Sequence, residues 1–108
     1  MSDKECIARV KAHIDANYSG QVTIARLARL ACMSASKLKY SFKAAVGLTV
    51  HSYLTEVRMG RAEQLLADTK LPVARVAEMV GYKKAGAFAA AFKKRKGRLP
   101  KDTRKKIA

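Results

Sequence analysis

The sequence has few of the residues that mark loop-rich, disulfide-bonded or membrane-embedded proteins. Its 108 residues include two prolines, six glycines and two cysteines, and tryptophan is absent. Cys6 and Cys32 are too few for a disulfide framework and lack metal-site spacing, so we expect free, largely buried thiols in a reducing cytoplasm. No apolar run approaches the roughly 20 residues of a membrane span. The N-terminus also lacks the apolar segment of a secretion signal.

Motifs of catalysis and cofactor binding are missing as well. The chain contains no H-x-x-x-H, C-x-x-C or G-x-S-x-G pattern and no glycine-rich phosphate loop. His13 and His51 are isolated histidines. Thr23, Ser34 and Thr49 precede apolar periodic segments, where a hydroxyl fits a helix cap better than a nucleophile. We therefore expect a protein that is not an enzyme and that needs no metal and no cofactor.

Acidic residues are scarce, and this imbalance is the strongest compositional signal. Eight Asp and Glu oppose 23 Lys and Arg, which gives a formal net charge of +15. Such a charge indicates a polyanionic partner, namely DNA, RNA or an anionic membrane surface. Residues 93–106 alone hold nine positive side chains and one negative one. A membrane partner is disfavoured because the apolar face of the last sixteen residues is reduced to Leu99 and Ile107.

Apolar residues recur with a helical period along the chain, and no window alternates with the period of a strand. The sequence therefore predicts an all-α fold. Hydroxyl residues or proline precede most periodic segments, and glycine ends several of them. The predicted helices run from Ser2 to Gly20, from Thr23 to the turn before Ser34, from Ser34 to Gly47, from Thr49 to about Thr69, from Pro72 to Gly81 and from about Lys84 to Gly97, and Pro100 opens a short basic last helix or tail.

The predicted core consists of aliphatic residues and a few aromatic rings. Met33 and Met79 are expected to fill gaps in it. Gly60 lies inside the fourth helix at a cost of about 1 kcal/mol relative to Ala, so we expect packing to offset that cost. The inward positions are Ile7, Val10, Ile14, Ile24, Leu27, Ala28, Leu30, Leu38, Phe42, Val46, Val50, Tyr53, Leu54, Val57, Ala62, Leu65, Leu66, Val73, Val76, Ala77, Val80, Phe88 and Phe92.

Two parts of the sequence repeat. The pattern Ala-Arg-x-Ala at 25–28 recurs at 74–77, and Phe-Lys-x-x-x-Gly at 42–47 recurs at 92–97. Chance similarity between two alanine-rich helices is the alternative explanation. It is less favoured because a short helix, a tight turn, a longer helix and a terminal glycine all recur in the same order.

Each repeat has the layout of a helix-turn-helix unit, whose second helix enters the major groove of DNA. The predicted division is a first unit at 1–47, a linker helix at 48–69, and a second unit with a basic C-terminal segment at 70–108. A linker of about 18 residues spans roughly 27 Å. With the radii of the helices added, such a linker can hold two reading helices about 34 Å apart, which is one turn of DNA.

The sequence resembles the C-terminal DNA-binding domain of the AraC/XylS family of bacterial regulators, from about Lys4 to Arg104. The resemblance implies two helix-turn-helix subdomains, a promoter site read in adjacent major grooves, and activation through RNA polymerase. The matching residues are Leu27-Ala28, Met33-Ser34-x-Ser36-x-Leu38, Phe42-Lys43, Gly47, Tyr53-Leu54, Arg58, Ala62, Leu65-Leu66, Pro72-Val73-x-x-Val76-Ala77, Val80-Gly81-Tyr82, Phe88, Phe92-Lys93-x-x-x-Gly97 and Pro100.

The resemblance also places the residues that would contact DNA. Base-reading positions fall on Ser36, Lys39 and Tyr40 in the first unit and on Gly86, Ala89 and Ala90 in the second. Alanine can contact only a thymine methyl group, so we expect the first unit to carry most of the specificity. The expected phosphate contacts are Ser34, Lys37, Lys43, Lys83, Lys84, Lys93, Lys94, Arg95 and Lys96.

Two departures from the family affect the ends of the molecule. Leu99 and Thr103 replace a usual cap and a usual aromatic residue, which makes the last helix less secure. The chain has no room for the effector-binding domain of many members, so we expect a stand-alone regulator or one domain of a longer protein. We expect a monomer on promoter DNA in the bacterial cytoplasm, associated with the nucleoid and in contact with RNA polymerase. A non-specific nucleic-acid binder is the alternative.

Overall fold

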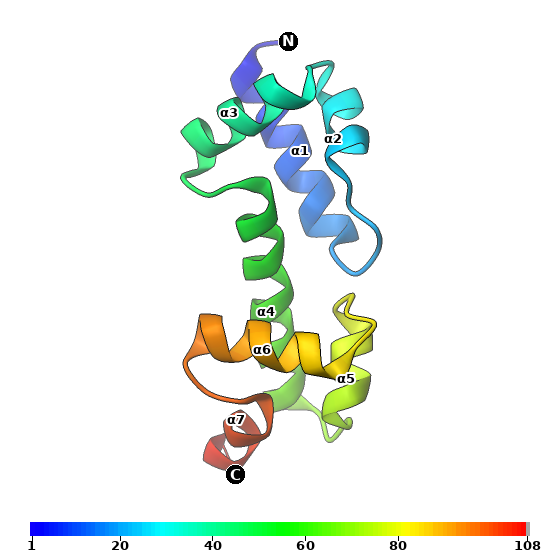
Figure 1. Ribbon diagram of the computed structural model, residues 1–108, viewed down its shortest axis with the longest axis vertical. Coiled ribbons are helices and arrows are strands. Elements are labelled where there is room, and N and C mark those ends of the chain that lie inside the picture. Colours follow the sequence, from blue (N-terminus) through cyan, green and yellow to red (C-terminus); the bar gives the residue numbers. More distant parts are fainter. Residues whose placement is uncertain (108) are drawn as a thin grey trace. The chain divides into compact units, whose positions relative to one another are not determined.

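The computed structural model describes residues 1–107, and the side chains of residues 1–104 (Figure 1). This part of the chain forms seven helices and no strand, so the predicted all-α fold is confirmed. The helices are α1 (Asp3–Asn17), α2 (Ile24–Ala31), α3 (Ala35–Val46), α4 (Val50–Asp68), α5 (Val73–Met79), α6 (Ala85–Lys96) and α7 (Pro100–Ile107). None of the helices in this part is both long enough and apolar enough to cross a membrane.

The chain divides into two compact units, Met1–Leu54 and Thr55–Ala108. Helices α1, α2 and α3 belong to the first unit and α5, α6 and α7 to the second, and α4 contributes to both. The boundary lies within α4, so the linker helix has no core of its own. The expected division into 1–47, 48–69 and 70–108 stays a prediction.

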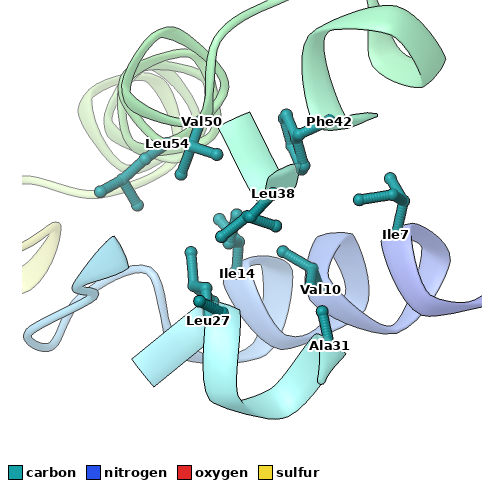
Figure 2. Packing of buried hydrophobic residues seen from close by; sticks show 10 residues of the cluster. Ile7, Val10, Ile14, Leu27, Ala31, Leu38, Phe42, Val50 and Leu54 are labelled. Atoms are coloured by element: carbon teal, nitrogen blue, oxygen red, sulfur yellow. The ribbon is translucent and has the colours of Figure 1, made fainter. Parts of the chain in front are cut away.

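The core of the first unit forms where α1, α2, α3 and the start of α4 meet (Figure 2). Its side chains point toward one another, and burial of each larger one contributes about 1.5–3 kcal/mol. As a consequence, α3 turns one face inward and presents the other to solvent. The buried residues labelled there are Ile7, Val10 and Ile14 of α1, Leu27 and Ala31 of α2, Leu38 and Phe42 of α3, and Val50 and Leu54 of α4.

Side-chain caps start four of the helices where the sequence predicts them. The hydroxyl oxygens of Ser2, Thr23, Ser34 and Thr49 each accept a hydrogen bond from the backbone N–H three residues later, at 3.0–3.2 Å. At Ser2 the side chain of Glu5 completes a capping box. Each cap contributes about 1 kcal/mol and fixes the residue at which its helix begins.

The core of the second unit centres on two phenylalanines of α6. Phe88 and Phe92 are fully buried with ring centroids 5.8 Å apart, and the Tyr82 ring meets Phe88 edge-on at 5.7 Å. Neither α5 nor α6 has a side-chain cap, and Pro72 lies at the N-cap of α5, one position before its first turn. The other fully buried large residues of this unit are Met59, Leu66, Val76, Val80 and Thr103.

Two expectations about sulfur-containing residues are wrong. Cys32 was expected to be buried but is exposed, because it ends α2 in the left-handed conformation (φ 55°) that turns its side chain outward. Met79 was expected in the core but is 36% exposed at the last residue of α5. Cys6 and Met33 are half-buried, so neither is a full member of the core.

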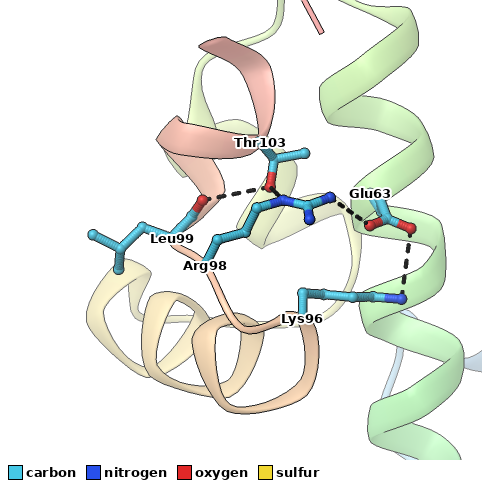
Figure 3. A network of polar contacts seen from close by, with 5 residues as sticks. All are labelled: Glu63, Lys96, Arg98, Leu99 and Thr103. Carbon is cyan, nitrogen blue, oxygen red and sulfur yellow. Dashed lines mark hydrogen bonds and ion pairs between the residues drawn. The ribbon is translucent and has the colours of Figure 1, made fainter. Parts of the chain in front are cut away.

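A polar network ties the last helix to α4 (Figure 3). Glu63 pairs with the Lys96 ammonium at 3.6 Å and with Arg98 Nη2 at 3.2 Å. Arg98 Nε donates to the hydroxyl of Thr103 at 2.9 Å, and this hydroxyl donates to the Leu99 carbonyl at 3.4 Å. Thr103 is fully buried and its hydroxyl is hydrogen-bonded, so it anchors α7 although it was expected to make this helix less secure.

Gly60 lies in the middle of α4, but no packing constraint explains it. A β-carbon added there would meet nothing within 4 Å, so no close neighbour requires glycine at this position. Gly81 differs, because its φ is +103° and a β-carbon would lie 3.0 Å from Arg58 Cζ. The Arg58 guanidinium lies over the Tyr82 ring, 5.5 Å from its centroid, so a side chain at Gly81 would have to displace this contact.

These environments predict opposite effects of the same substitution. Gly60→Ala should raise the free energy of unfolding by about 0.5–1 kcal/mol, because alanine restricts the unfolded chain and fits the helix. Gly81→Ala should lower it through backbone strain and the clash with Arg58. Urea denaturation of both variants measures the two free energies of unfolding. A loss of stability in Gly60→Ala would show that position 60 does not tolerate a β-carbon.

Tyr53 joins α4 to α1 within the first unit. Its hydroxyl donates to Asp15 Oδ1 at 2.5 Å, its ring packs edge-on against Phe42 with centroids 5.7 Å apart, and Lys11 Nζ lies 5.6 Å from its ring centroid. Burial, followed by the hydrogen bond and charge of Asp15, raises the pKa of Tyr53 from 10.0 to about 12. The folded state therefore favours the protonated phenol.

This shift predicts a pH-dependent contribution to stability. Tyr53→Phe should cost about 1 kcal/mol at pH 8, where the phenol hydrogen bond is fully formed. A pKa raised on folding stabilises the protein below the unfolded pKa of 10.0, and this stabilisation is lost as the pH rises toward 12. The difference in unfolding free energy between wild type and variant should thus shrink from pH 10 upward. A difference that stays constant over this range would disprove the linkage.

Candidate nucleic-acid interface

Helix α3 presents a polar face opposite its buried one. Leu38 and Phe42 have no exposed surface, and residues three or four positions apart share a face of a helix. The expected reading residues Ser36, Lys39 and Tyr40 are all exposed, and Tyr40 is 79% exposed. The structure therefore brings these three side chains together on the solvent side of α3.

The exposed face of α3 is hollowed rather than flat. An open hollow of about 450 Å³ lies between α3 and the residue that caps α4, and it is lined by Lys39, Tyr40, Lys43, Ala44 and Thr49. It places two ammonium groups and a phenol around mostly apolar walls. Such a surface can donate hydrogen bonds to base edges or phosphates and can contact a thymine methyl group.

Two of the expected phosphate contacts at the start of α3 also have structural partners. The Ser34 hydroxyl oxygen accepts the Lys37 N–H at 3.1 Å, which leaves the hydroxyl hydrogen available for donation. The Lys37 ammonium pairs with Asp3 at 3.4 Å, and both side chains are more than half exposed. An exposed pair of this kind contributes at most about 1 kcal/mol, so a phosphate can displace it.

Helix α6 repeats the burial pattern of α3 but not its chemistry. Phe88 and Phe92 face the core, and the expected reading positions are exposed at Gly86 and Ala90 and half-buried at Ala89. No side chain from residue 85 to residue 92 can form a hydrogen bond. The outward face of α6 is therefore a smooth surface of alanine methyl groups.

Lysines and arginines surround that smooth surface, but they fall into two classes. Lys83, Lys84, Lys93 and Lys94 are exposed, and no ion pair to them is present among residues 1–104. Arg95 instead pairs with Glu56 at 3.2 Å, and its side chain is 24% exposed. The run 93–96 thus contains exposed cations followed by cations that α4 already engages.

Two C-terminal cations, Lys96 and Arg104, have structural partners that the sequence analysis missed. Lys96 pairs with Glu63 (Figure 3) with only 22% of its side chain exposed. Arg104 donates to the carbonyls of Leu66 and Thr69 at 3.3 and 3.2 Å, which satisfies acceptors at the end of α4. Lys101 is exposed, and Lys105 and Lys106 lie outside the described side chains.

A sequence signal for these pairs exists. Glu56 and Glu63 are seven residues apart on α4, a spacing that places both carboxylates on one face of a helix. Acidic residues are scarce in this chain, so two on one face of the linking helix could have indicated a docking site for part of the basic segment.

Comparison with known proteins supports the arrangement of helices. A family model described as a helix-turn-helix domain matches residues 27–106. The arabinose operon regulatory protein of Escherichia coli (strain K12) is 31% identical over 102 residues, which cover 94% of this chain and 34% of that protein. The chain spans between 34% and 38% of the length of three curated relatives, of which this is one.

Two solved structures show the same fold. The C-terminal domain of AraT, a response regulator from Geobacillus stearothermophilus, has a TM-score of 0.90 and 31% identity, covering 94% of this chain and 84% of that one. The DNA-binding domain of AdpA, a global transcriptional factor solved in complex with a target DNA, has a TM-score of 0.86 and 26% identity, covering 91% and 88%. With the paired helix-turn-helix units, these matches establish that the chain belongs to the AraC-type family of helix-turn-helix domains.

Proposed function

We propose that this chain is the DNA-reading part of a transcription regulator and binds a specific double-stranded promoter site. The observation that carries the proposal is the exposed triad of Ser36, Lys39 and Tyr40, opposite the buried side chains of α3. A lysine ammonium can donate to guanine O6 and N7, and hydroxyl groups can bond to bases or phosphates. The AdpA domain, which was solved with its target DNA, supports this use of the fold.

The two units contribute unequally to this proposal. Because α6 exposes only Gly86, Ala89 and Ala90 at its reading positions, it can contact thymine methyl groups but cannot read hydrogen-bonding edges. The second unit then binds mainly phosphate, which adds affinity without sequence information. Specificity is concentrated in α3.

The phosphate contacts follow the exposure of each basic side chain. In the first unit they are Ser34, Lys37 and Lys43, and in the second they are mainly Lys83, Lys84, Lys93 and Lys94. Arg95 and Lys96 have a smaller share, because Glu56 and Glu63 already neutralise them.

The proposed mode of binding is a monomer in two adjacent major grooves. Among residues 1–104, the large apolar side chains of the helices mostly lie within the two cores, which favours a monomer over a pair of chains. Contact with RNA polymerase and a place on the bacterial nucleoid complete the proposed role. This role rests on binding rather than on catalysis.

A non-specific nucleic-acid binder is the second candidate, and two observations favour it. The net charge of +15 binds any polyanion, and the alanine face of α6 reads little. A built reading face on α3 is not required for such a role. The candidates therefore differ in whether changing α3 alters sequence preference or only affinity.

Lys39→Ala should weaken binding to the preferred duplex by about 5- to 150-fold, which corresponds to the 1–3 kcal/mol of one specific base contact. Binding to a scrambled duplex of equal length should change much less. Lys70→Ala removes an exposed lysine outside both reading helices and serves as the matched control. Fluorescence anisotropy titrations at fixed salt measure the affinity of the wild type and of both variants for each duplex. An equal loss on both duplexes would show that Lys39 only binds phosphate and would favour the second candidate.

The two classes of cation near α6 should differ in the salt dependence of binding. Replacing Lys93 and Lys94 together with alanine should reduce the slope of log K against log salt by about 1.8, because each phosphate contact contributes about 0.9. Replacing Arg95 and Lys96 should change the slope less but lower the melting temperature, because Glu56 loses its partner and Glu63 keeps only Arg98.

Affinities at four salt concentrations and thermal melts of both double variants provide the comparison. Equal reductions in slope for the two double variants, with equal melting temperatures, would contradict the prediction. They would show that the ion pairs to α4 do not reduce the contribution of Arg95 and Lys96 to DNA binding.

A further inference from the structure

The first unit contains a sulfur-lined cleft away from the reading face of α3. The cleft has a volume of about 330 Å³ and lies between α1 and the turn that follows α2. Both cysteines of the chain border it, and two methionines border it as well. The residues that line the cleft include Met1, Cys6, Arg9, Cys32, Met33 and Lys37.

The backbone of the turn holds Cys32 at the edge of this cleft. Its N–H donates to the Arg29 carbonyl at 3.2 Å, and the next N–H, that of Met33, donates to the Ala28 carbonyl at 3.0 Å. Cys32 is the only non-glycine residue with a positive φ in the described part of the chain. A β-carbon in this conformation costs about 1 kcal/mol, and glycine is the usual residue at such a helix end.

Cys6 supplies the second thiol from α1, where it is half-buried beside the core. Two cationic side chains, Arg9 and Lys37, and one acidic side chain, Asp3, line the same cleft as the thiols. Arg9 Nη1 lies 3.6 Å from the Met1 sulfur. Cysteine binds metals as the thiolate, so metal binding at this cleft requires loss of the thiol protons.

We propose that Cys6 and Cys32 bind one soft monovalent metal ion, Cu(I), with a thioether of the cleft as a weaker additional ligand. Thiolates and thioethers are the ligands that select Cu(I) among biological metals. In the described residues no group of three or more His, Cys, Asp and Glu could hold a metal, so the ligand set of a four-coordinate zinc site is missing. Two thiolates are sufficient for a two-coordinate ion.

The charge balance fits this ion. One Cu(I) displaces the protons of both thiols, which gives a bis-thiolate complex of net charge −1 and two released protons. The anionic complex is attracted to Arg9 and Lys37, whose charge Asp3 offsets only in part. Bound metal would also join α1 to the turn that precedes the reading helix, and so would stabilise the first unit.

Competition with a chromophoric Cu(I) chelator tests the site. The reduced full chain is titrated with Cu(I) without oxygen, and one ion per chain should transfer from the chelator to the protein. Cys32→Ser and Cys6→Ser should each weaken binding by more than about 100-fold, beyond the 10- to 100-fold effect of residues that only support ligands. Below the thiol pKa values the affinity should rise about 100-fold per pH unit, because two protons are released.

Matched variants separate ligation from folding. Cys32→Gly suits the left-handed turn, so it should keep the fold by circular dichroism while losing the metal. Met33→Leu should weaken binding, whereas Met79→Leu, at the exposed end of α5, should not. The proposal is overturned if the chelator retains the metal, if the cysteine variants bind as well as wild type, or if one ion binds per two chains. DNA binding is measured separately, so failure here leaves the proposed function untouched.

Discussion

Each second helix of the two units depends on a pair of large side chains four residues apart. Leu38 and Phe42 anchor α3, Phe88 and Phe92 anchor α6, and all four are fully buried. A helix that buries one stripe must expose the opposite one, so this packing decides which residues can reach a partner. The repeat in the sequence thus corresponds to the same buried pair of positions in each unit. The two exposed faces then diverge, with Lys39 and Tyr40 on α3 and alanine methyl groups on α6.

Charge in this chain has two uses that composition alone does not separate. In the second unit, Glu56 forms an ion pair with Arg95, and Glu63 forms ion pairs with Lys96 and Arg98. These pairs connect α6 and the segment before α7 to α4. Beside α6, the cations that stay exposed are Lys83 and Lys84 before the helix and Lys93 and Lys94 near its end. A net charge of +15 therefore overstates the number of cations available to a polyanion. The same side chains that indicate a nucleic-acid partner also complete the fold.

Local signals made the fold predictable, and non-local contacts limited the rest. The caps at Ser2, Thr23 and Ser34 were predictable because each depends on a hydroxyl and an N–H three residues away. The burial of Thr103 was not, because it depends on Arg98 and on packing against α6. The exposure of Cys32 depends on a left-handed turn that the sequence marks with cysteine instead of glycine. The resemblance located the reading positions, but only the structure shows their exposure.

The most direct test of the account is a selection of bound duplexes from a random DNA library at near-physiological salt, followed by titration of the preferred duplex against scrambled DNA. The account predicts one asymmetric site of about two helical turns, with strong base preference in one half and weak preference in the other. The preferred duplex should bind about a thousandfold more tightly than scrambled DNA. The account would be contradicted if no sequence were enriched and every duplex bound equally, with a steep salt dependence. In that case α3 would contact only the phosphate backbone of DNA.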